Sequence, residues 1–406
     1  MQDGYDVLLI GGGLVGASLG CALAGSGLRL GLVEPARLSG AQPGGYDDRV
    51  IALSAGSQRV FGTTGVWSAI APQAAAIRAV HISERGRFGV ATLEAAEQGV
   101  PALGYVAPAR AIGQALVERL SGVAEVTLLS PARFTGLQAA GDRALVSLDT
   151  GSGRRDVTAR LVVAADGAES PVRAALGVPA LRWGYGQSAV IANVSTERPH
   201  RHVAYERFTD SGPLAMLPMT EGRSALVLTV RDGDADRLMG MDDASFAATV
   251  EQRFGGRLGR LLRVGRREVH PLALVKARAH FRSRVALIGN AAHTLHPVAG
   301  QGFNLGLRDV AALAEVIVDA ARAGEDLGAD QTLARYARWR AGDQWRTVGF
   351  TDLLVRLFGN PLLPVRAARG LGLLAFQALP PAKRLLARHA MGLTGPLPRL
   401  ARGLAL

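Results

Sequence analysis

The beginning of the chain is the feature that most limits the possible fold. A strand-like apolar run leads into the sequence GGGLVG at residues 11–16, and an apolar run that suits a helix follows. In a strand–turn–helix unit of this kind, Gly11 permits the tight turn, Gly13 lets a pyrophosphate approach the backbone, and Gly16 lets helix and strand pack closely. A second apolar run ends in Glu34, where such units place an acid that hydrogen-bonds a ribose. These residues predict a βαβ unit that binds a dinucleotide, with a purely structural turn as the alternative.

A second glycine-rich segment occupies residues 289–309 and has the sequence GNAAHTLHPVAGQGFNLGLRD. It follows a strand-like run at 284–288 and leads into apolar residues at helical spacing, so we expect a helix to begin near Phe303. Glycines let backbone amides approach a ligand closely, and a helix N-terminus presents free N–H groups and a positive dipole end. The segment therefore predicts a loop that meets a ligand carrying or developing negative charge.

A third candidate loop follows the apolar, strand-like run at residues 161–165. Its sequence, DGAESPVR at 166–173, places an acid and a glycine at the strand end. Ser170 suits a helix N-cap, and Pro171 suits the first helical position. The pattern indicates a loop that holds a polar ligand, although an ordinary strand–turn–helix has the same features.

Taken in order, these three motifs resemble those of the flavoprotein aromatic hydroxylases related to para-hydroxybenzoate hydroxylase. That family carries GxGxxG, then DGxxSxxR, then GDAAHxxxPxxGQGxNxGxxD, and here Asn290 replaces the aspartate of the last motif. Further segments narrow the resemblance to the ubiquinone-biosynthesis hydroxylases, and within them to the 2-polyprenyl-6-methoxyphenol hydroxylases. These segments are DDRVIALS at 47–54, QSAVIANV at 187–194, ERFT at 206–209, GPLAMLPM at 212–219 and TDL at 351–353. The resemblance covers nearly the whole chain.

The resemblance implies an FAD-dependent monooxygenase. In that family NAD(P)H reduces FAD, the reduced flavin captures O₂ as a C4a-hydroperoxide, and one oxygen atom passes to an electron-rich phenol. The implied reaction converts a 2-polyprenyl-6-methoxyphenol to the 1,4-benzoquinol in ubiquinone biosynthesis. Because the chain has only one dinucleotide fingerprint, we expect NAD(P)H to bind transiently or a partner protein to deliver the electrons.

The resemblance also assigns residues to the cofactor. Glu34 would bind the adenosine ribose, Asp166 another polar part of FAD, and Arg49 the pyrophosphate and the edge of the active site. The full set is Gly11, Gly13, Gly16, Glu34, Arg49, Arg110, Gln114, Asp166, Gly167, Gly289, Asn290, Pro297, Gly300, Gln301, Gly302, Phe303 and Asn304. Residues 108–109, Pro-Ala, depart from the Glu-Asn pair that the family has just before the arginine of this set.

The flavin ring would meet the loop that precedes the late helix. We expect Arg49, Pro297, Gln301 and Gly302 to shape the surroundings of the ring, because small or rigid residues permit close approach. The positive end of the helix would stabilise the anionic reduced flavin by about 0.3–2 kcal/mol. These four residues are the catalytic set that the resemblance implies, without an identified acid or base.

The sequence offers no evident base that activates the phenol. His81, Tyr205 and Arg207, in strand-like segments, and His293, in the late motif, are candidates to contact the substrate, with structural roles as the alternative. His293 and His296 lie three residues apart, but no cysteine or carboxylate ligand set accompanies them. We therefore expect no metal site.

The alternation of strands and helices predicts an α/β fold. The resemblance implies two domains, a Rossmann-like FAD-binding domain and a sheet-rich substrate domain, as in para-hydroxybenzoate hydroxylase. The division is 1–75, 100–180 and 270–330 for the FAD-binding domain, 76–99 and 181–269 for the substrate domain, and 331–406 for a C-terminal helical region. In this last region the spacing predicts separate helices at 333–345 and 352–358.

The formal net charge is +12. No zinc-finger spacing, RNA-binding motif or long basic arm accompanies it, so we expect no nucleic-acid partner. Residues 351–406 hold eight arginines and lysines and one acid beside apolar runs, which suits an anionic membrane surface or simply solvent-facing helices. With Cys21 as the only cysteine and no long apolar span, we expect a cytoplasmic enzyme that does not span a membrane. The resemblance implies contact with ubiquinone-biosynthesis proteins, and together with the basic C-terminal segment it implies a peripheral position on the inner membrane.

Other functions remain open at this point. One is hydroxylation at another position of the ubiquinone ring, or of a small phenol; an apolar tunnel from the substrate sheet to the surface would favour the polyprenyl substrate. Another is a flavin-bearing scaffold subunit, against which Arg49 and the complete loop at 297–304 argue. A third is an NAD-dependent dehydrogenase, which would not need the late motif.

Overall fold

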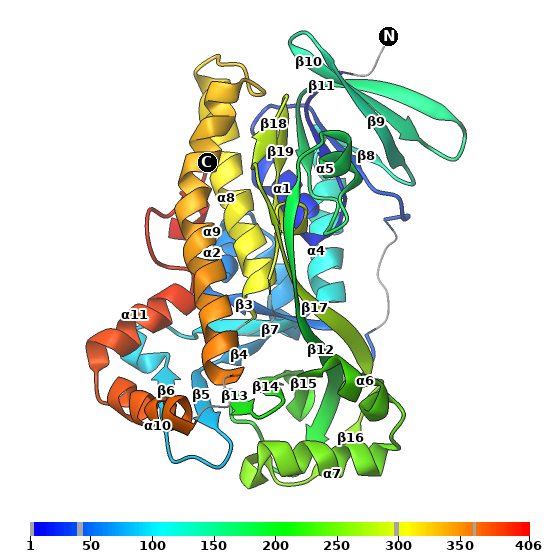
Figure 1. The fold of residues 1–406 in the computed structure, drawn as a ribbon. Helices are drawn as coiled ribbons and strands as arrows, with labels where there is room; N and C mark the ends of the chain where they lie inside the picture. Colours follow the sequence, from blue (N-terminus) through cyan, green and yellow to red (C-terminus); the bar gives the residue numbers. More distant parts are fainter. Residues whose placement is uncertain (1–3, 39–43, 296–299, 360–362) are drawn as a thin grey trace.

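The computed structural model describes residues 4–38, 44–295, 300–359 and 363–406. Within these residues the chain forms three sheets, with helices packed on them and a group of C-terminal helices at one side (Figure 1). The α/β fold class expected from the sequence is confirmed.

The first sheet is built around the N-terminal βαβ unit. β1 (Gly4–Ile10) pairs in parallel with β2 (Leu30–Val33) and β11 (Arg154–Ala164), and β11 pairs in parallel with β19 (Val285–Leu287). The sheet is completed by β8 (Val126–Leu129), β9 (Arg133–Ala140), β10 (Arg143–Asp149) and β18 (Phe281–Arg282). Because parallel neighbours end at the same edge, the three sequence motifs, which follow β1, β11 and β19, meet there.

Both faces of this sheet are buried, which explains its continuous apolar strands. One face is covered by helices α1 (Leu14–Leu23), α4 (Ala109–Ser121) and α8 (Gln301–Arg322). Val7 and Leu9 pack there, whereas Leu8 and Ile10 pack on the other face with the β9–β10 hairpin. Cys21 of α1 is buried, and burial raises the pKa of its thiol to about 12, so it is a protonated core side chain.

The second sheet forms the lower part of the molecule in Figure 1. Its strands are β5 (Ala79–Glu84), β6 (Val90–Glu94), β12 (Ala180–Thr196), β13 (Val203–Thr209), β14 (Gly212–Pro218), β15 (Arg223–Arg231), β16 (Leu261–Val264), β17 (Glu268–Ala277) and β20 (His293–Thr294). Helices α6 (Asp232–Met239) and α7 (Asp243–Phe254) cover one face. Alternation decides which residues face them: Leu214 and Met216 pack in that core, while Pro213 and Ala215 line a cavity on the other face.

A small third sheet lies between the other two (Figure 1). It consists of β3 (Val50–Ser54), β4 (Ala75–Ile77) and β7 (Gly104–Pro108). The short helices α2 (Ala55–Thr63) and α3 (Trp67–Ile70) complete this part of the chain, whereas α5 (Pro171–Ala175) follows β11 and packs against β9 of the first sheet.

The C-terminal region differs from the prediction in one element. Helix α9 runs without interruption over Asp330–Gly359, where the sequence predicted two helices. Its middle is stabilised by packing on α8: Thr347 is fully buried, and its hydroxyl accepts a hydrogen bond from the Arg308 guanidinium. Helices α10 (Leu363–Gln377) and α11 (Pro380–Ala390) follow. In the described part of the chain, no helix is both long and apolar enough to span a membrane.

Candidate functional site

A cavity of about 1020 Å³ lies where the motif-bearing sheet edge meets the second sheet. Its wall includes Gly13 from the first motif, Gly167 from the second, and residues 300–304 from the third. Arg49, directly before β3, and the residues of β3 itself form another part of the wall, and the second sheet supplies a largely apolar part. The three motifs recognised in the sequence thus converge on one space.

The first motif forms the expected turn after β1. Gly11 has a positive φ of +104°, and a Cβ on Gly16 would lie 1.9 Å from the Gly11 carbonyl oxygen, so both positions require glycine. A Cβ on Gly13 would meet nothing within 4 Å, which leaves free space at the position assigned to the pyrophosphate. The carboxylate of Glu34 accepts a hydrogen bond from the Gly12 N–H at 2.8 Å and therefore lies beside the turn.

The second motif leaves an acid with unused hydrogen-bonding capacity. Asp166 Oδ2 accepts a hydrogen bond from the Val172 N–H at 3.1 Å, whereas Oδ1 is buried and has no partner among the described residues. Burial raises the pKa of this carboxyl group, although hydrogen bonds from Ser170 and the backbone act in the opposite direction. A buried acceptor without a partner is costly, so the position suits a ligand that donates a hydrogen bond.

Arg173 joins the second motif to the third. Its guanidinium donates to the carbonyl oxygens of Ala168 at 2.7 Å and Ala291 at 2.8 Å. The side chain is buried. The arginine of the DGxxSxxR pattern therefore holds two of the motif loops together.

The third motif starts a helix at the cavity. Helix α8 begins at Gln301, two residues before the predicted start, and Gly300 precedes it with φ +60°. Gln301 is buried and its amide Nε2 donates to the carbonyl oxygen of Ala390 in α11 at 3.3 Å. A Cβ on Gly302 would meet nothing within 4 Å, so this position opens onto free space. Pro297 and His296 lie outside the described residues.

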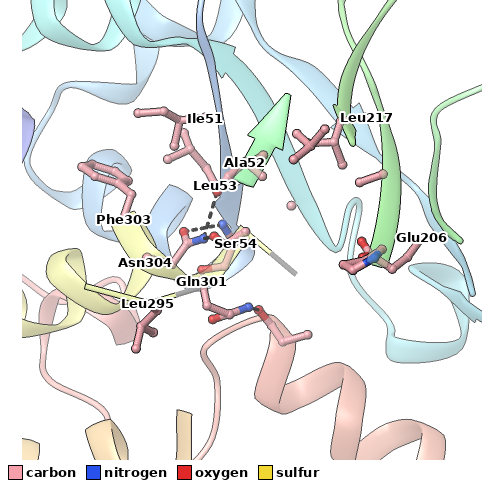
Figure 2. A pocket seen from close by; sticks show the side chains of 18 of the residues that line it. Ile51, Ala52, Leu53, Ser54, Glu206, Leu217, Leu295, Gln301, Phe303 and Asn304 are labelled. Carbon is pink, nitrogen blue, oxygen red and sulfur yellow. Dashed lines mark hydrogen bonds between the residues drawn. The ribbon is translucent and has the colours of Figure 1, made fainter. Parts of the chain in front are cut away.

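Asn304 connects the start of α8 to β3, as Figure 2 shows. Its Oδ1 accepts hydrogen bonds from the Ser54 N–H at 2.8 Å and the Ser57 hydroxyl at 2.7 Å. Its Nδ2 donates to the carbonyl oxygens of Ala52 at 2.8 Å and Gly300 at 2.7 Å. All four hydrogen-bonding positions of the amide are thus used within the protein, and the side chain positions the helix start.

Of the predicted cofactor residues outside the loops, some line the cavity and others contact protein side chains instead. Arg49 and Asn290 line the cavity. Arg110 instead forms an ion pair with Asp48 at 3.2 Å, and Gln114 donates to the Glu118 carboxylate at 2.9 Å. These last two contacts direct Arg110 and Gln114 toward neighbouring protein groups.

All four predicted substrate residues lie on strands of the second sheet: His81 on β5, Tyr205 and Arg207 on β13, and His293 on β20. The rings of His81 and Tyr205 are 5.6 Å apart, and Tyr205 packs edge-on against Phe254 of α7. Arg207 donates to the carbonyl oxygen of Arg253, also of α7, at 3.1 Å. The cavity wall includes Tyr205. Burial, assisted by Arg257 and Arg207, lowers the pKa of His81 to about 4, so this imidazole is neutral near pH 7.

His293, the fourth, belongs to a buried ionic network. Its Nε2 lies 2.6 Å from Asp309 Oδ2, and both side chains are almost completely buried. The other oxygen of Asp309 accepts a hydrogen bond from Arg340 Nε at 2.7 Å. In the described residues, no three His, Cys, Asp or Glu side chains gather as a metal ligand set would.

The sequence reasoning missed Glu206. Strand β13 alternates, so Glu206 points to the face opposite Tyr205 and Arg207 and lines the cavity with Ala204 and Phe208. In Figure 2 it lies across the cavity from Phe303 and Asn304, the residues that begin α8. Burial raises the pKa of its carboxyl group to about 7. The signal in the sequence is a single acid on the face of a strand that otherwise presents apolar residues.

Comparison with known proteins identifies relatives over the full length of the chain. The profile of a family described as FAD binding domain matches residues 4–351. Ubiquinone hydroxylase UbiL of Rhodospirillum rubrum is 42% identical over 99% of this chain and 93% of its own length. The 3-demethoxyubiquinol 3-hydroxylase of Escherichia coli is 34% identical over 96% of this chain and 98% of its own length.

A solved structure supports the fold. The p-nitrophenol 4-monooxygenase PnpA of Pseudomonas putida superimposes with a TM-score of 0.80, covering 97% of this chain and 99% of that one. Its sequence identity is 19%, so this likeness concerns the fold alone.

Proposed function

Because this chain belongs to the FAD binding domain family, in the group of flavoprotein hydroxylases that includes the ubiquinone hydroxylases, we propose that it hydroxylates the ring of a polyprenyl phenol in ubiquinone biosynthesis. The chain is an FAD-dependent monooxygenase, as its sequence predicted, and it uses O₂ together with electrons from NAD(P)H or from a partner protein. When bound, FAD supplies the oxygen-transfer chemistry. The protein binds and orients the reactants and excludes water.

The motif loops fit FAD on grounds independent of the family. Free space at Gly13 leaves room for a pyrophosphate, and Asp166 Oδ1 has an unused position for a donor of the cofactor. The N-terminus of α8 at Gln301 presents free N–H groups and a positive dipole end toward the cavity. The other predicted cofactor contacts remain part of the proposal; those of Arg110 and Gln114 require the side chains to leave their present partners.

The observation that carries the polyprenyl substrate is the apolar extension of the cavity. Beyond the motif loops, the wall continues along β5 and β6 and reaches helices α10 and α11. The residues of this part are Val80, Ile82, Leu93, Leu103, Leu373, Phe376, Leu386, Ala387 and Met391. A small phenol has no need of such a wall, whereas a prenyl tail gains about 25 cal/mol for each Å² of apolar surface it buries.

For the ring position, we propose conversion of a 2-polyprenyl-6-methoxyphenol to the 1,4-benzoquinol, on the sequence resemblance. The name of the Escherichia coli relative, a 3-demethoxyubiquinol 3-hydroxylase, favours hydroxylation at another carbon as the second candidate. We propose as well that the division into FAD-binding and substrate domains predicted from the sequence describes the working parts of the enzyme.

The test supplies the purified, FAD-loaded enzyme with NADH and isotopically labelled O₂. One reaction contains 2-methoxy-6-prenylphenol and the other a short-chain demethoxyubiquinol, and mass spectrometry locates the label. Label in the 1,4-quinol supports the first position, and label in the second product moves the activity to the alternative carbon. Oxidation of NADH without a labelled product in either reaction would overturn the proposed function. Quinone precursors that accumulate after gene deletion provide the check in cells.

We further propose that the enzyme works at a membrane surface through α10 and α11, because a polyprenyl phenol is almost insoluble in water. Leu374, Leu379 and Leu385 are 47%, 53% and 68% exposed there. Two of the basic residues in this region form ion pairs within the protein: Arg369 pairs with Glu84 at 2.6 Å, and Lys383 pairs with Glu97 at 2.8 Å. The proposed contact therefore combines these leucines with basic residues that stay exposed, such as Arg384 and Arg388 of α11.

A further inference from the structure

We propose that Glu206 is the base that accepts the phenolic proton of the substrate. This inference deepens the proposed function and rests on it, since it requires a phenol in the cavity. It assigns a role that the sequence reasoning left without a residue.

The position of Glu206 on its sheet supports this role. In β13 it lies opposite Ala215 of β14 and Ile82 of β5, and both neighbours line the same cavity. The Glu206 carboxylate makes no hydrogen bond or ion pair with any described residue, although it is half-buried. A carboxylate on an apolar wall is poorly solvated, so a donor that enters the cavity would be strongly attracted to it.

Glu206 also lies on the appropriate side of the cavity. Figure 2 shows it on the sheet wall, with Gln301, Phe303 and Asn304 on the other side. The start of α8 is where the resemblance places the flavin ring, so a phenol between the two walls would have its hydroxyl toward Glu206 and its ring toward the flavin loop.

Other charged groups are distributed around this position. Glu84 of the neighbouring strand is already paired with Arg369 of α10. On the opposite face of β13 lies Arg207, beside His81. Among the described residues, the others that line the cavity and carry charged or titratable groups are Arg49, Glu169, Arg182, His270 and Tyr205, although the Tyr205 ring itself packs on Phe254 of α7. Burial nevertheless remains the dominant influence on the pKa of the Glu206 carboxyl group.

The proton transfer has the following balance. The phenolic O–H bond breaks, its proton forms a bond to a Glu206 oxygen, and the electron pair stays on the phenolic oxygen. The added electron density on the ring favours attack on the electrophilic oxygen derived from O₂. The attacked carbon then releases its hydrogen as a proton, which is consumed in the water formed from the second oxygen atom. The proton on Glu206 returns to the phenolic oxygen as the ring becomes aromatic again.

The acidity of Glu206 suits this task. A general base is most effective when its pKa lies near the working pH. Burial raises the pKa of Glu206 to about 7, so both of its forms are available near neutral pH.

The test measures binding of two matched ligands to the FAD-loaded enzyme without NAD(P)H. The first is 2-methoxy-6-prenylphenol, and the second is its methyl ether, which has no proton to donate. Dissociation constants are measured between pH 5 and pH 9, where the phenol itself stays neutral, for the wild type and for Glu206→Gln and Glu206→Asp. Glu94→Gln is the control, because Glu94 is exposed and does not line the cavity.

We expect the wild type to bind the phenol more tightly than the ether. The ratio of the two dissociation constants should be roughly tenfold larger at pH 9 than at pH 5, because ionised Glu206 accepts a charge-assisted hydrogen bond from the phenol. Glu206→Gln should lose this pH dependence while still binding the ether, and Glu206→Asp should restore part of it. The Glu94→Gln control should behave as the wild type.

An equal pH dependence in the wild type and in Glu206→Gln would overturn the role of Glu206 while leaving the proposed function standing. If the wild type binds neither ligand, the prenyl-phenol substrate itself is wrong and the role of Glu206 fails with it. A slower kcat for hydroxylation in Glu206→Gln, with an unchanged rate of flavin reduction by NAD(P)H, would give a second, kinetic confirmation.

Discussion

His293 and Asp309 form a buried pair in which the imidazole Nε2 lies 2.6 Å from Asp309 Oδ2. The same carboxylate accepts hydrogen bonds from Arg340 Nε at 2.7 Å, Gln344 Nε2 at 3.1 Å and the Gly289 N–H at 3.1 Å. Asp309 therefore joins the loop after β19, helix α8 and helix α9, which together set the position of the flavin loop. Although burial alone would raise the pKa of Asp309, His293 and Arg340 bring it well below its usual range.

Replacing Asp309 with Asn should destabilise the protein strongly. The change removes the carboxylate that pairs with the buried Arg340 guanidinium. Breaking a buried ion pair typically costs about 3–5 kcal/mol. Asp319→Asn, on the exposed side of the same helix, should cost at most about 1 kcal/mol. Urea unfolding of the three proteins measures the difference, and similar free energies of unfolding for both variants would contradict the expectation.

The same pair predicts an acid-sensitive fold. Because the folded protein depresses the pKa of Asp309, its contribution to stability is complete above the unfolded pKa of about 4 and declines as the pH falls below that value. The stability gap between the wild type and Asp309→Asn should therefore be constant between pH 6 and pH 8 and should narrow below pH 4. A gap that widens in acid would show that other groups dominate.

Gly13→Val should give a folded protein that does not retain FAD. Gly13 has φ −63°, which valine adopts without strain, and its Cβ position is open, so only the space for the pyrophosphate is lost. Gly16→Ala is the contrasting variant, because its Cβ would collide with the Gly11 carbonyl oxygen and lower the stability itself. Flavin absorbance and thermal unfolding separate the two effects. Stoichiometric flavin in folded Gly13→Val would mean that the turn serves only the fold.

Gly302→Leu should retain FAD and lose hydroxylation. The position opens onto the cavity, so the protein accommodates the side chain, which then occupies space beside the flavin ring. The measurement compares flavin content with labelled product for each NADH oxidised, and the wild type run in parallel is the control. Unchanged product formation would place this loop away from the ring.

Leu379→Glu combined with Leu385→Glu should weaken flotation with anionic liposomes. Point changes are preferable to deletion of residues 360–406, because Met391 packs in the core beside Ala55. Leu262→Glu on β16 is the matched control, since Leu262 is 62% exposed on another part of the protein. Binding should also decline in part at high salt, because salt screens the exposed arginines Arg384 and Arg388 but not the leucines. Equal flotation of all variants would exclude α10 and α11 as the contact.

Much of the nucleotide site is readable from the sequence, because its determinants are local. The turn at residues 11–16, the cap at Ser170 and the start of α8 each depend on backbone conformations that a few neighbouring residues impose. Parallel strands then bring such motifs to one edge of the sheet, so their convergence also follows from the pattern.

The side-chain partners were decided only by the tertiary structure. The opposite orientations of Glu206 and Tyr205 follow from strand alternation, but which face meets the cavity depends on where α7 packs. In the same way, Lys383 pairs with Glu97 across 286 positions of the chain, and Arg369 pairs with Glu84 across 285. Local sequence determines the backbone that can bind a dinucleotide. The burial, the pKa and the availability of each charged group arise only when distant segments pack, because the free energy of a charge depends on what replaces water around it.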